Sequence, residues 1–318
     1  MKIIDWRQAP VDDVAALLLE ECETWQTDLG WNLAESWRDV EPARSKGQLP
    51  GLVAYDDRGR PSGWTLFLRH REALQIGALA AVDAATTAAL VEGILAAPEA
   101  SGASTILSFT RAQAPGLAEE LAAHDFEIEP YRYCEAHTEL VTGVGENIRS
   151  WTAGDMPAIT ELLGAAYAPS TELRPFALEG RSEEWVEYIR QLVGTRACGA
   201  FLADASAVAQ AGQRGSLDGA VLTTSIDPAT AHIAQVAVAP SSQGRGVGGR
   251  LVSWASAMAH VAGYARITLL VAARNQAANA VYTRLGFNQT ALFLAAVRRQ
   301  PRSSTNAGWA IDGASTFR

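Results

Sequence analysis

The stretch Gln243-Gly244-Arg245-Gly246-Val247-Gly248 decides how this chain folds. Residues 232–238, which precede it, form an apolar alternating run that predicts a strand. Residues 249–262, which follow it, carry apolar residues at helical spacing. Glycines let the backbone approach an anion closely, and the free N–H groups in the first turn of a helix then point at that anion. The stretch therefore predicts a cradle for a pyrophosphate group.

Two common phosphate-binding loops are not expected here. A Walker loop carries a Lys-Ser/Thr pair after its last glycine, whereas Arg250 and Leu251 follow Gly249 here. A dinucleotide fingerprint needs G-x-G-x-x-G early in a βαβ unit, and Gly244, Gly246 and Gly249, which have this spacing, lie late in the chain. We assign the stretch to neither class.

The pattern Gln-x-x-Gly-x-Gly resembles the acyl-CoA loop of the GNAT superfamily of N-acetyltransferases. A predicted buried strand at 267–272, then Asn275, then Asn-Ala-Val-Tyr-Thr-Arg-Leu-Gly-Phe at 279–287 are similar to the family's next strand, helix and turn. The resemblance implies an α/β (α+β) fold, a mixed and mostly antiparallel twisted sheet flanked by helices. It also implies an enzyme that transfers an acyl group, most simply from acetyl-CoA to a primary amine of a small molecule by direct attack.

Length and composition set wider limits. A chain of 318 residues, 48% hydrophobic and 19% charged, is globular and long enough for two domains. No apolar leader or membrane span is expected, and a net charge of −9 disfavours nucleic acid while it is compatible with a cationic amine. Three cysteines without C-x-x-C spacing predict a reduced, cytoplasmic setting and no metal site.

One plan is expected to occur twice along the chain. Two predicted helices are followed directly by Phe126 and Phe287, which lie 161 residues apart (287 minus 126), although an alanine-rich chain can produce such matches by accident. The matched segments, first copy before second, are strands 3–7 and 147–151, helices 11–19 and 156–166, hairpins 52–55/63–68 and 201–203/219–225, strands 105–110 and 267–272, and helices 117–125 and 277–286.

The first copy, 1–142, is predicted to be a degenerate GNAT-like domain, and the second, 146–318, the catalytic one. After Val82 the first copy continues into a helix without glycines, and a backbone with Cβ atoms cannot easily present several N–H groups to a pyrophosphate. It also has no phenol to match Tyr282. Four tryptophans of this copy either line a cleft or fill its core: Trp25, Trp31, Trp37 and Trp64. A chain with an internal pseudo-dimer is compatible with a monomer or a homodimer.

The acyl-CoA site follows from the same resemblance. Backbone N–H groups from Gly244 to Gly249 hold the pyrophosphate with help from the helix dipole, while Arg245 and Arg250 either pair with phosphate oxygens or are solvated. The cofactor-binding residues expected are Val236, Ala237, Val238, Gln243, Gly244, Arg245, Gly246, Val247, Gly248, Gly249, Arg250, Asn275, Asn279 and Tyr282.

The chemical roles are also implied by the resemblance. Strand 234–238 separates from its neighbour and frees a backbone N–H near Val238 for the thioester carbonyl, a donor typically worth about 3 kcal/mol of barrier. Tyr282 is the expected general acid for the departing thiolate, its alternative being an aromatic that packs helix on sheet. Asn275 and Asn279 bind the pantetheine arm or order the helix start, where Asn275 also fits a helix cap.

His232 is the expected catalytic base, because the family often places one on the strand before the glycine loop; the alternative is a surface histidine at a strand end. Residues 169–195 are expected to cap the acceptor site. The glutamates of this segment attract a cationic acceptor or form a solvated helix face, and they are Glu172, Glu179, Glu183, Glu184 and Glu187.

Two other functions remain open from the sequence. The same fold could use a longer acyl-CoA or decarboxylate a malonyl group, which turnover without an acceptor would reveal. A non-catalytic module that senses acyl-CoA is the second, and the joint presence of the loop, Asn275 and Tyr282 argues against it because a sensor needs no acid. Residues 300–307 are predicted to form a loop, and 309–317 a last strand.

Overall fold

The computed structural model describes residues 1–34, 38, 40–70, 72–138, 147–168, 170, 172–174, 176–195, 198–210 and 216–299. Trp37, the tail 300–307 and the strand predicted at 309–317 lie outside these residues. The strands are β1 (Lys2–Asp5), β2 (Gly51–Tyr55), β3 (Pro61–His70), β4 (Ala73–Ala81), β5 (Thr105–Arg111), β6 (Glu127–His137), β7 (Ile148–Ser150), β8 (Ala200–Phe201), β9 (Ala207–Gln210), β10 (Leu217–Asp227), β11 (Thr230–Val238), β12 (Arg266–Ala272) and β13 (Asn288–Arg299). The helices are α1 (Val11–Leu29), α3 (Val40–Ser45), α4 (Ala84–Ala96), α5 (Leu117–Ala123), α6 (Met156–Tyr167), α7 (Ser182–Gly194), α8 (Val247–Val261) and α9 (Gln276–Arg284). No helix in the described part is both long and apolar enough to cross a membrane.

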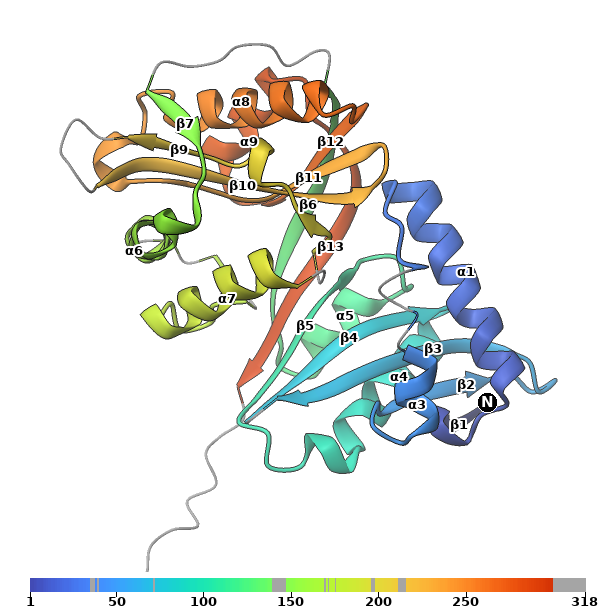
Figure 1. The fold of residues 1–318 in the computed structure, drawn as a ribbon. Helices are drawn as coiled ribbons and strands as arrows, with labels where there is room; N and C mark the ends of the chain where they lie inside the picture. The colour runs from blue at the N-terminus through green and yellow to red at the C-terminus, as the bar shows by residue number, and fades with distance from the viewer. Residues whose placement is uncertain are drawn as a thin grey trace, which may run out of the picture.

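One 13-stranded sheet runs through the described residues in the order β1-β2-β3-β4-β5-β13-β6-β12-β11-β10-β9-β7, with β8 on β10 (Figure 1). Counted inward from its two ends, the sheet places each strand of one copy opposite its counterpart in the other. The counterparts are β1 and β7, β2 and β9, β3 and β10, β4 and β11, β5 and β12, and β13 and β6. All pairs are antiparallel except β4 with β5 and β11 with β12. These two parallel pairs begin at Thr105 and Arg266, 161 residues apart (266 minus 105), as Phe126 and Phe287 are.

The two copies exchange their last strands. β6 belongs to the first copy by sequence, yet its sheet neighbours are β12 and β13 of the second. Tyr131 at its middle lies opposite Ala272 on one side and Phe293 on the other. β13 in turn pairs with β5 of the first copy, and both long strands run from one half of the molecule to the other in Figure 1. Each copy therefore completes the sheet of its partner copy.

The predicted fold class is confirmed, since the sheet is mixed, mostly antiparallel and flanked by helices. The sequence did not predict that the two sheets are continuous. The boundary proposed between 142 and 146 falls within residues 139–146, outside the described residues, and stays a prediction.

Two elements differ from the sequence prediction. The helix expected at 249–262 begins two residues earlier, at Val247, because Gly246 caps it in the left-handed region at φ 76°. The hairpin predicted from 201–203 and 219–225 is only a small part of the pairing. β10 pairs with β8 over two registers, but with β9, which was not predicted, over four. The short Ala-Val-Ala-Gln run of β9 is weak in β-branched residues, so its pairing is determined by burial against β10 rather than by propensity.

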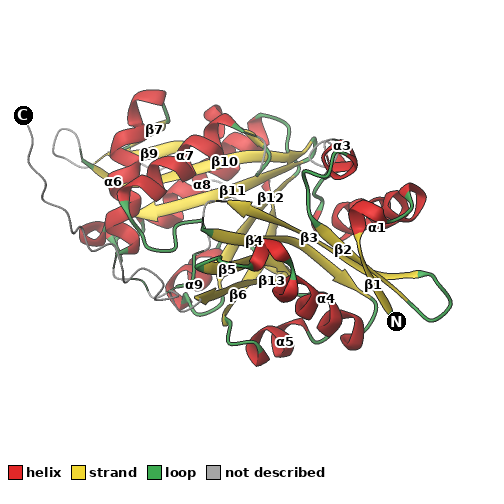
Figure 2. Cartoon of the chain, turned by 90° about the horizontal axis from the view of Figure 1, so that it is seen from below, coloured by secondary structure: helices red, strands yellow, loops and turns green. Residues whose placement is uncertain are grey.

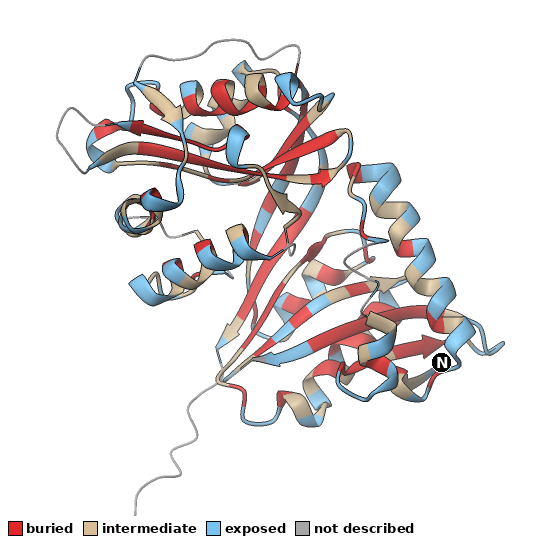
Figure 3. Cartoon of the chain, in the orientation of Figure 1, coloured by how far each residue is buried: buried red, intermediate tan, exposed pale blue. Residues whose placement is uncertain are grey.

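Helices cover both faces of the second copy's sheet. α8 packs Val247, Leu251 and Trp254 into a core with β11 and β12, while α6 and α7 pack Leu163, Trp185 and Ile189 against β10 and β11. Figure 2 shows helices on either side of the strands, and Figure 3 shows that buried residues follow the strands and the inner helix faces.

The tryptophans of the first copy belong to its packing. Trp64 is buried and stacks on Trp6 with ring centroids 6.1 Å apart. Trp25 and Trp31 are partly buried, lie edge to face at 5.5 Å, and pack with Phe293 of the second copy. The core alternative is the one that the structure supports.

The strand exchange predicts that the two copies cannot separate. We expect a chain cut by a specific protease at a site inserted between residues 142 and 143 to elute as one species in size-exclusion chromatography under native conditions. The reason is that β6 has both of its strand neighbours in the other fragment. Elution of two folded fragments at their own sizes would show that each copy completes its own sheet.

Candidate active site

The sheet opens between β11 and β12. The two strands pair in parallel from Thr230 with Arg266 to Ile233 with Leu269, and no further. Beyond this point β11 stays on β10 and β12 stays on β6. The opening starts at Ala234, the extra residue of a β-bulge opposite Leu222 and Thr223 of β10. Bulges commonly redirect strands beside active sites, and this one coincides with the end of the pairing.

Backbone groups of β11 face the opening. The Ala239 N–H donates to Asp218 O on the β10 side at 2.9 Å, so by alternation Val238 and Val236 direct their N–H and C=O groups the other way. The Val238 carbonyl accepts a long bond of 3.4 Å from Gln243 Nε2. This alternation directs the Val238 N–H into the opening, and its role as the donor to the thioester carbonyl stays a prediction.

The glycine loop presents further free donors. Gly244 and Gly246 have φ of 73° and 76°, which L side chains rarely adopt. The first backbone bond of α8 runs from Arg250 N to Gly246 O at 3.1 Å. Within the described part of the chain, no acceptor receives the N–H groups of Val247, Gly248 and Gly249. Donors without an acceptor at the positive end of a 15-residue helix are the kind of site that a pyrophosphate fits.

The two loop arginines have different settings. Arg250 folds back so that Nη1 donates to the Arg245 carbonyl at 2.9 Å, which supports the loop and places a guanidinium beside it. Arg245 is exposed. Both cations border the free N–H groups, and both alternatives predicted for them remain compatible with these positions.

The first copy blocks the equivalent helix end. α4 begins at a cap residue, Asp83, whose carboxylate accepts from Thr86 N at 2.7 Å. The backbone hydrogen bond from Thr86 lowers the pKa of Asp83, so the carboxylate is ionised. A negative charge therefore occupies the place where a pyrophosphate would have to bind, which is a stronger obstacle than the missing glycines.

Asn275 and Asn279 order the start of α9. The Asn275 side chain caps the helix by accepting from Ala278 N at 3.0 Å. Asn279 Nδ2 donates to Ala272 O at 3.0 Å and to Asn275 O at 2.7 Å, which ties the helix to the end of β12. The structure thus shows the ordering role, and contact with the pantetheine arm stays a prediction.

Tyr282 lies one helix turn further along α9. Its ring packs on the α8 side of the core, 5.9 Å from the Phe287 ring. Among the described residues its hydroxyl has no hydrogen-bond partner. Burial, followed by the nearby Tyr167, Cys134 and Glu172, raises the pKa of Tyr282, so the phenol keeps its proton at neutral pH.

His232 does not lie beside Tyr282. It is 4% exposed, its Nδ1 is hydrogen-bonded to Thr268 Oγ1 at 2.9 Å, and its ring lies against Trp31 and Tyr133. It precedes Val238 by six residues, or about 20 Å of strand. Burial lowers the pKa of His232 to about 4. A histidine enclosed in this way is poorly placed to accept a proton from an amine at the opening.

The opposite face of the opening carries polar residues that sequence reasoning did not assign. Gln235 on β11 donates to the Tyr167 hydroxyl at 2.6 Å, and its Oε1 accepts from Tyr188 at 3.2 Å. Tyr188 also donates to the Ala234 carbonyl at 3.2 Å. These bonds hold α6 and α7 against the bulge. Nothing in the local pattern of α6 or α7 distinguishes such tyrosines from ordinary core residues.

Most glutamates of segment 169–195 face solvent or cap α7. Glu184 accepts from Arg181 N at 3.0 Å, and Glu187 pairs with Arg190 at 2.6 Å. Glu179 and Glu183 are exposed, as the solvated-face alternative requires. Glu172 differs, because its side chain is partly buried and burial raises its pKa.

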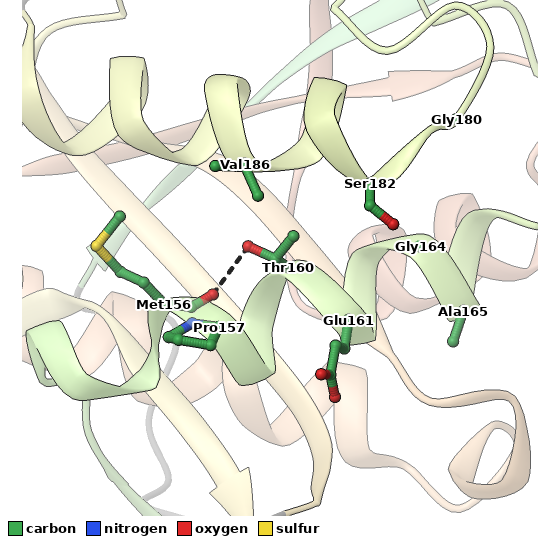
Figure 4. Close-up of a pocket in the computed structure, with 9 residues that line it drawn as sticks. All are labelled: Met156, Pro157, Thr160, Glu161, Gly164, Ala165, Gly180, Ser182 and Val186. Atoms are coloured by element: carbon green, nitrogen blue, oxygen red, sulfur yellow. Dashed lines mark hydrogen bonds between the residues drawn. The ribbon is translucent and has the colours of Figure 1, made fainter.

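A separate cavity of about 730 Å³ lies between α6 and α7 (Figure 4). Its wall includes Thr160, Glu161, Ser182 and Val186, and the Thr160 hydroxyl donates to Met156 O at 2.9 Å. None of its lining residues comes from the glycine loop, β11 or α9. The cavity is therefore distinct from the opening between β11 and β12.

Comparisons with known proteins agree with this geometry. Residues 164–287 match the model of the acetyltransferase (GNAT) family. No curated protein matches the chain by sequence. A GCN5-related N-acetyltransferase from Sphaerobacter thermophilus is similar in structure, with 16% identity, a TM-score of 0.65, and 93% of this chain and 95% of that one covered.

Two further solved structures resemble the chain. A GNAT-family acetyltransferase from Colwellia psychrerythraea has 12% identity and a TM-score of 0.52 over 93% of this chain and 99% of its own. A tandem GNAT protein from the clavulanic acid biosynthesis pathway has 18% identity and a TM-score of 0.50 over 80% and 84%. Such identities show a shared fold. The family match over residues 164–287 places a domain of the acetyltransferase (GNAT) family in the second copy.

Proposed function

We propose that the second copy transfers an acetyl group from acetyl-CoA to a primary amine of a small molecule. Three features of the second copy support this proposal: the free N–H groups of the glycine loop, the end of the β11–β12 pairing before Val238, and the phenol of Tyr282, which has no hydrogen-bond partner among the described residues. A site that only bound acyl-CoA would need the first of them.

In the proposed reaction, the loop and the α8 terminus hold the pyrophosphate, and the thioester enters the opening between β11 and β12. The amine nitrogen attacks the carbonyl carbon, and the oxygen that becomes negative is stabilised by the Val238 N–H. As the C–S bond breaks, the Tyr282 hydroxyl donates a proton to the thiolate. The phenolate recovers a proton from the acylated nitrogen, so CoA leaves as a thiol and the product is a neutral amide.

His232 takes no part in this proposal, because it is buried away from the opening and satisfied by Thr268. The direct test is a panel of amines with acetyl-CoA, followed by release of the CoA thiol. Release that depends on an amine would support N-acetylation. Release from malonyl-CoA without any acceptor would instead indicate decarboxylation, and binding of acetyl-CoA without release in any mixture would indicate a sensing module.

Gly248→Asp separates folding from acyl-CoA binding. Its backbone is not strained, and the nearest atom to an added Cβ is Val238 Cγ2 at 3.4 Å. A carboxylate in the first turn of α8 interacts favourably with the helix dipole, so the melting temperature should not fall. The same carboxylate should repel the pyrophosphate, as we expect Asp83 to do in the first copy. The matched variant is Gly248→Asn. We expect the Asp variant to bind acetyl-CoA at least about 10-fold more weakly than the Asn variant, about 1.4 kcal/mol, by calorimetry. Equal affinities would mean that the pyrophosphate binds elsewhere.

Tyr282→Phe removes the proton donor and keeps the ring. Because the hydroxyl makes no hydrogen bond in the described structure, stability and the Kd for acetyl-CoA should stay near their original values. We expect kcat to fall about 10²-fold between pH 6 and 9 in steady-state thiol release. Tyr264→Phe is the control, since Tyr264 packs on the same core beyond the end of α8. An unchanged kcat for the Tyr282 variant would leave this residue a packing role only.

A further inference from the structure

Four charged side chains gather where the second copy's opening meets the exchanged strand of the first copy. They come from three separate segments: β6, the residues between α6 and α7, and the turn after β12. The four are Glu129, Glu172, Arg174 and Arg274. Burial raises the pKa of three tyrosines from three elements, and the Glu172 carboxylate adds to the rise of each: Tyr131 of β6, Tyr167 of α6 and Tyr282 of α9.

One acid and one base of this group neutralise each other. Glu129 is 1% exposed and forms an ion pair with Arg274. The pair joins β6 to the turn that leads into α9. This ion pair therefore holds β6 of the first copy against the second copy.

Arg174 has no such partner. It is 9% exposed, yet no carboxylate of the described residues lies at ion-pair distance from it. Its guanidinium lies 5.2 Å from the centroid of the Tyr167 ring, Nη1 reaches the Ser170 carbonyl only at 3.5 Å, and the buried Nε makes no hydrogen bond. A buried cation left in this state is costly unless something else supplies the missing acceptors.

Glu172 is the complementary free acid, two residues away along the chain. Its side chain is partly buried, and Asn275, the cap of α9, opposes the rise of its pKa that burial causes. Burial raises the pKa of Glu172, with Arg174 and Arg274 opposing this rise and Glu129 adding to it. A carboxylate with a raised pKa is a better proton acceptor than an exposed one. Burial raises the pKa of Tyr282, the predicted acid, and the Glu172 charge adds to this rise.

We propose that Arg174 and Glu172 form the two ends of an acceptor subsite that takes an α-amino acid, with Arg174 binding the carboxylate and Glu172 facing the ammonium group. This inference rests on the proposed N-acetylation. Arg174 has unused N–H donors in a planar fork, which suits a carboxylate bound through two oxygens. An amine without a carboxylate would leave that buried cation unpaired, and sites of this kind reject such analogues strongly.

The proton balance of the reaction is then complete. Glu172 takes one proton from the ammonium group, which leaves the neutral amine that attacks the thioester carbon. The nitrogen loses a second proton as Tyr282 supplies one to the thiolate, and Glu172 later releases its proton to solvent. The products are an N-acetylated amino acid, CoA as a thiol, and one proton.

The test compares each L-amino acid with its own carboxamide, which keeps the amine and the side chain but removes the negative charge. We expect kcat/KM for the preferred amino acid to exceed that for its amide by at least about 10²-fold, measured as acetyl-CoA-dependent thiol release. Equal rates for both, or faster reaction of the amide or of simple alkylamines, would overturn the subsite while leaving N-acetylation intact. Failure of every amine to cause release would contradict the proposed function instead.

Two variants assign the roles. Arg174→Gln should raise KM for the amino acid about 10²-fold and leave the weak reaction of the amide unchanged, whereas a loss shared equally by both would indicate a folding defect and refute the anchor. Arg190→Gln is the control, an exposed arginine on α7.

Glu172→Gln should lower kcat by about 10²-fold or more with either acceptor, and the pH at which kcat/KM reaches its plateau should move upward, toward the pKa of the free amine. The charged and titratable groups that face Glu172 remain in this variant, namely Glu129, Tyr131, Tyr167, Arg174, Arg274 and Tyr282. Glu183→Gln, an exposed position of α7, is the control. An unchanged pH profile for Glu172→Gln would exclude it as the proton acceptor.

Discussion

The separation of β11 from β12 after Ile233 and Leu269 is the constraint on which the rest of the molecule depends. It turns paired backbone groups into free ones at Val236 and Val238, and it leaves a gap that is lined on one side by α8 and on the other by α6 and α7. The first copy separates its parallel strands in the same way, after Ile76 and Ser108. What differs is the helix that follows, because the α8 terminus is open to an anion whereas Asp83 closes that of α4.

Strand exchange gives the degenerate copy a physical reason to persist. β6 fills the position beside β12 that the second copy's own last strand leaves empty. The same strand carries Glu129, which binds Arg274, and Tyr131, which donates to the Leu173 carbonyl at 2.9 Å. Through these contacts the first copy packs against the residues of the second copy that we propose as its acceptor subsite. Loss of the first copy would therefore remove part of the proposed site as well as part of the sheet.

The sequence predicted the parts of the site that depend on local chemistry. A glycine loop between strand and helix, and an asparagine that caps the next helix, are visible because their causes lie within a few residues, as at Gly246 and Asn275. The strand exchange could not be predicted, since it rests on contacts between residues such as Tyr131 and Phe293, far apart in the chain. His232 shows the same limit, because its strand position suggested a base whereas tertiary burial lowers its pKa to about 4.

We expect only one of the two copies to bind acyl-CoA, which the stoichiometry of binding tests. Isothermal titration of the intact chain with acetyl-CoA should give one site per chain. The Asp83→Gly variant should also give one high-affinity site per chain. A stoichiometry of two in the unmodified chain would contradict the claim, because it would mean that the Asp83 carboxylate at the start of α4 does not exclude a pyrophosphate.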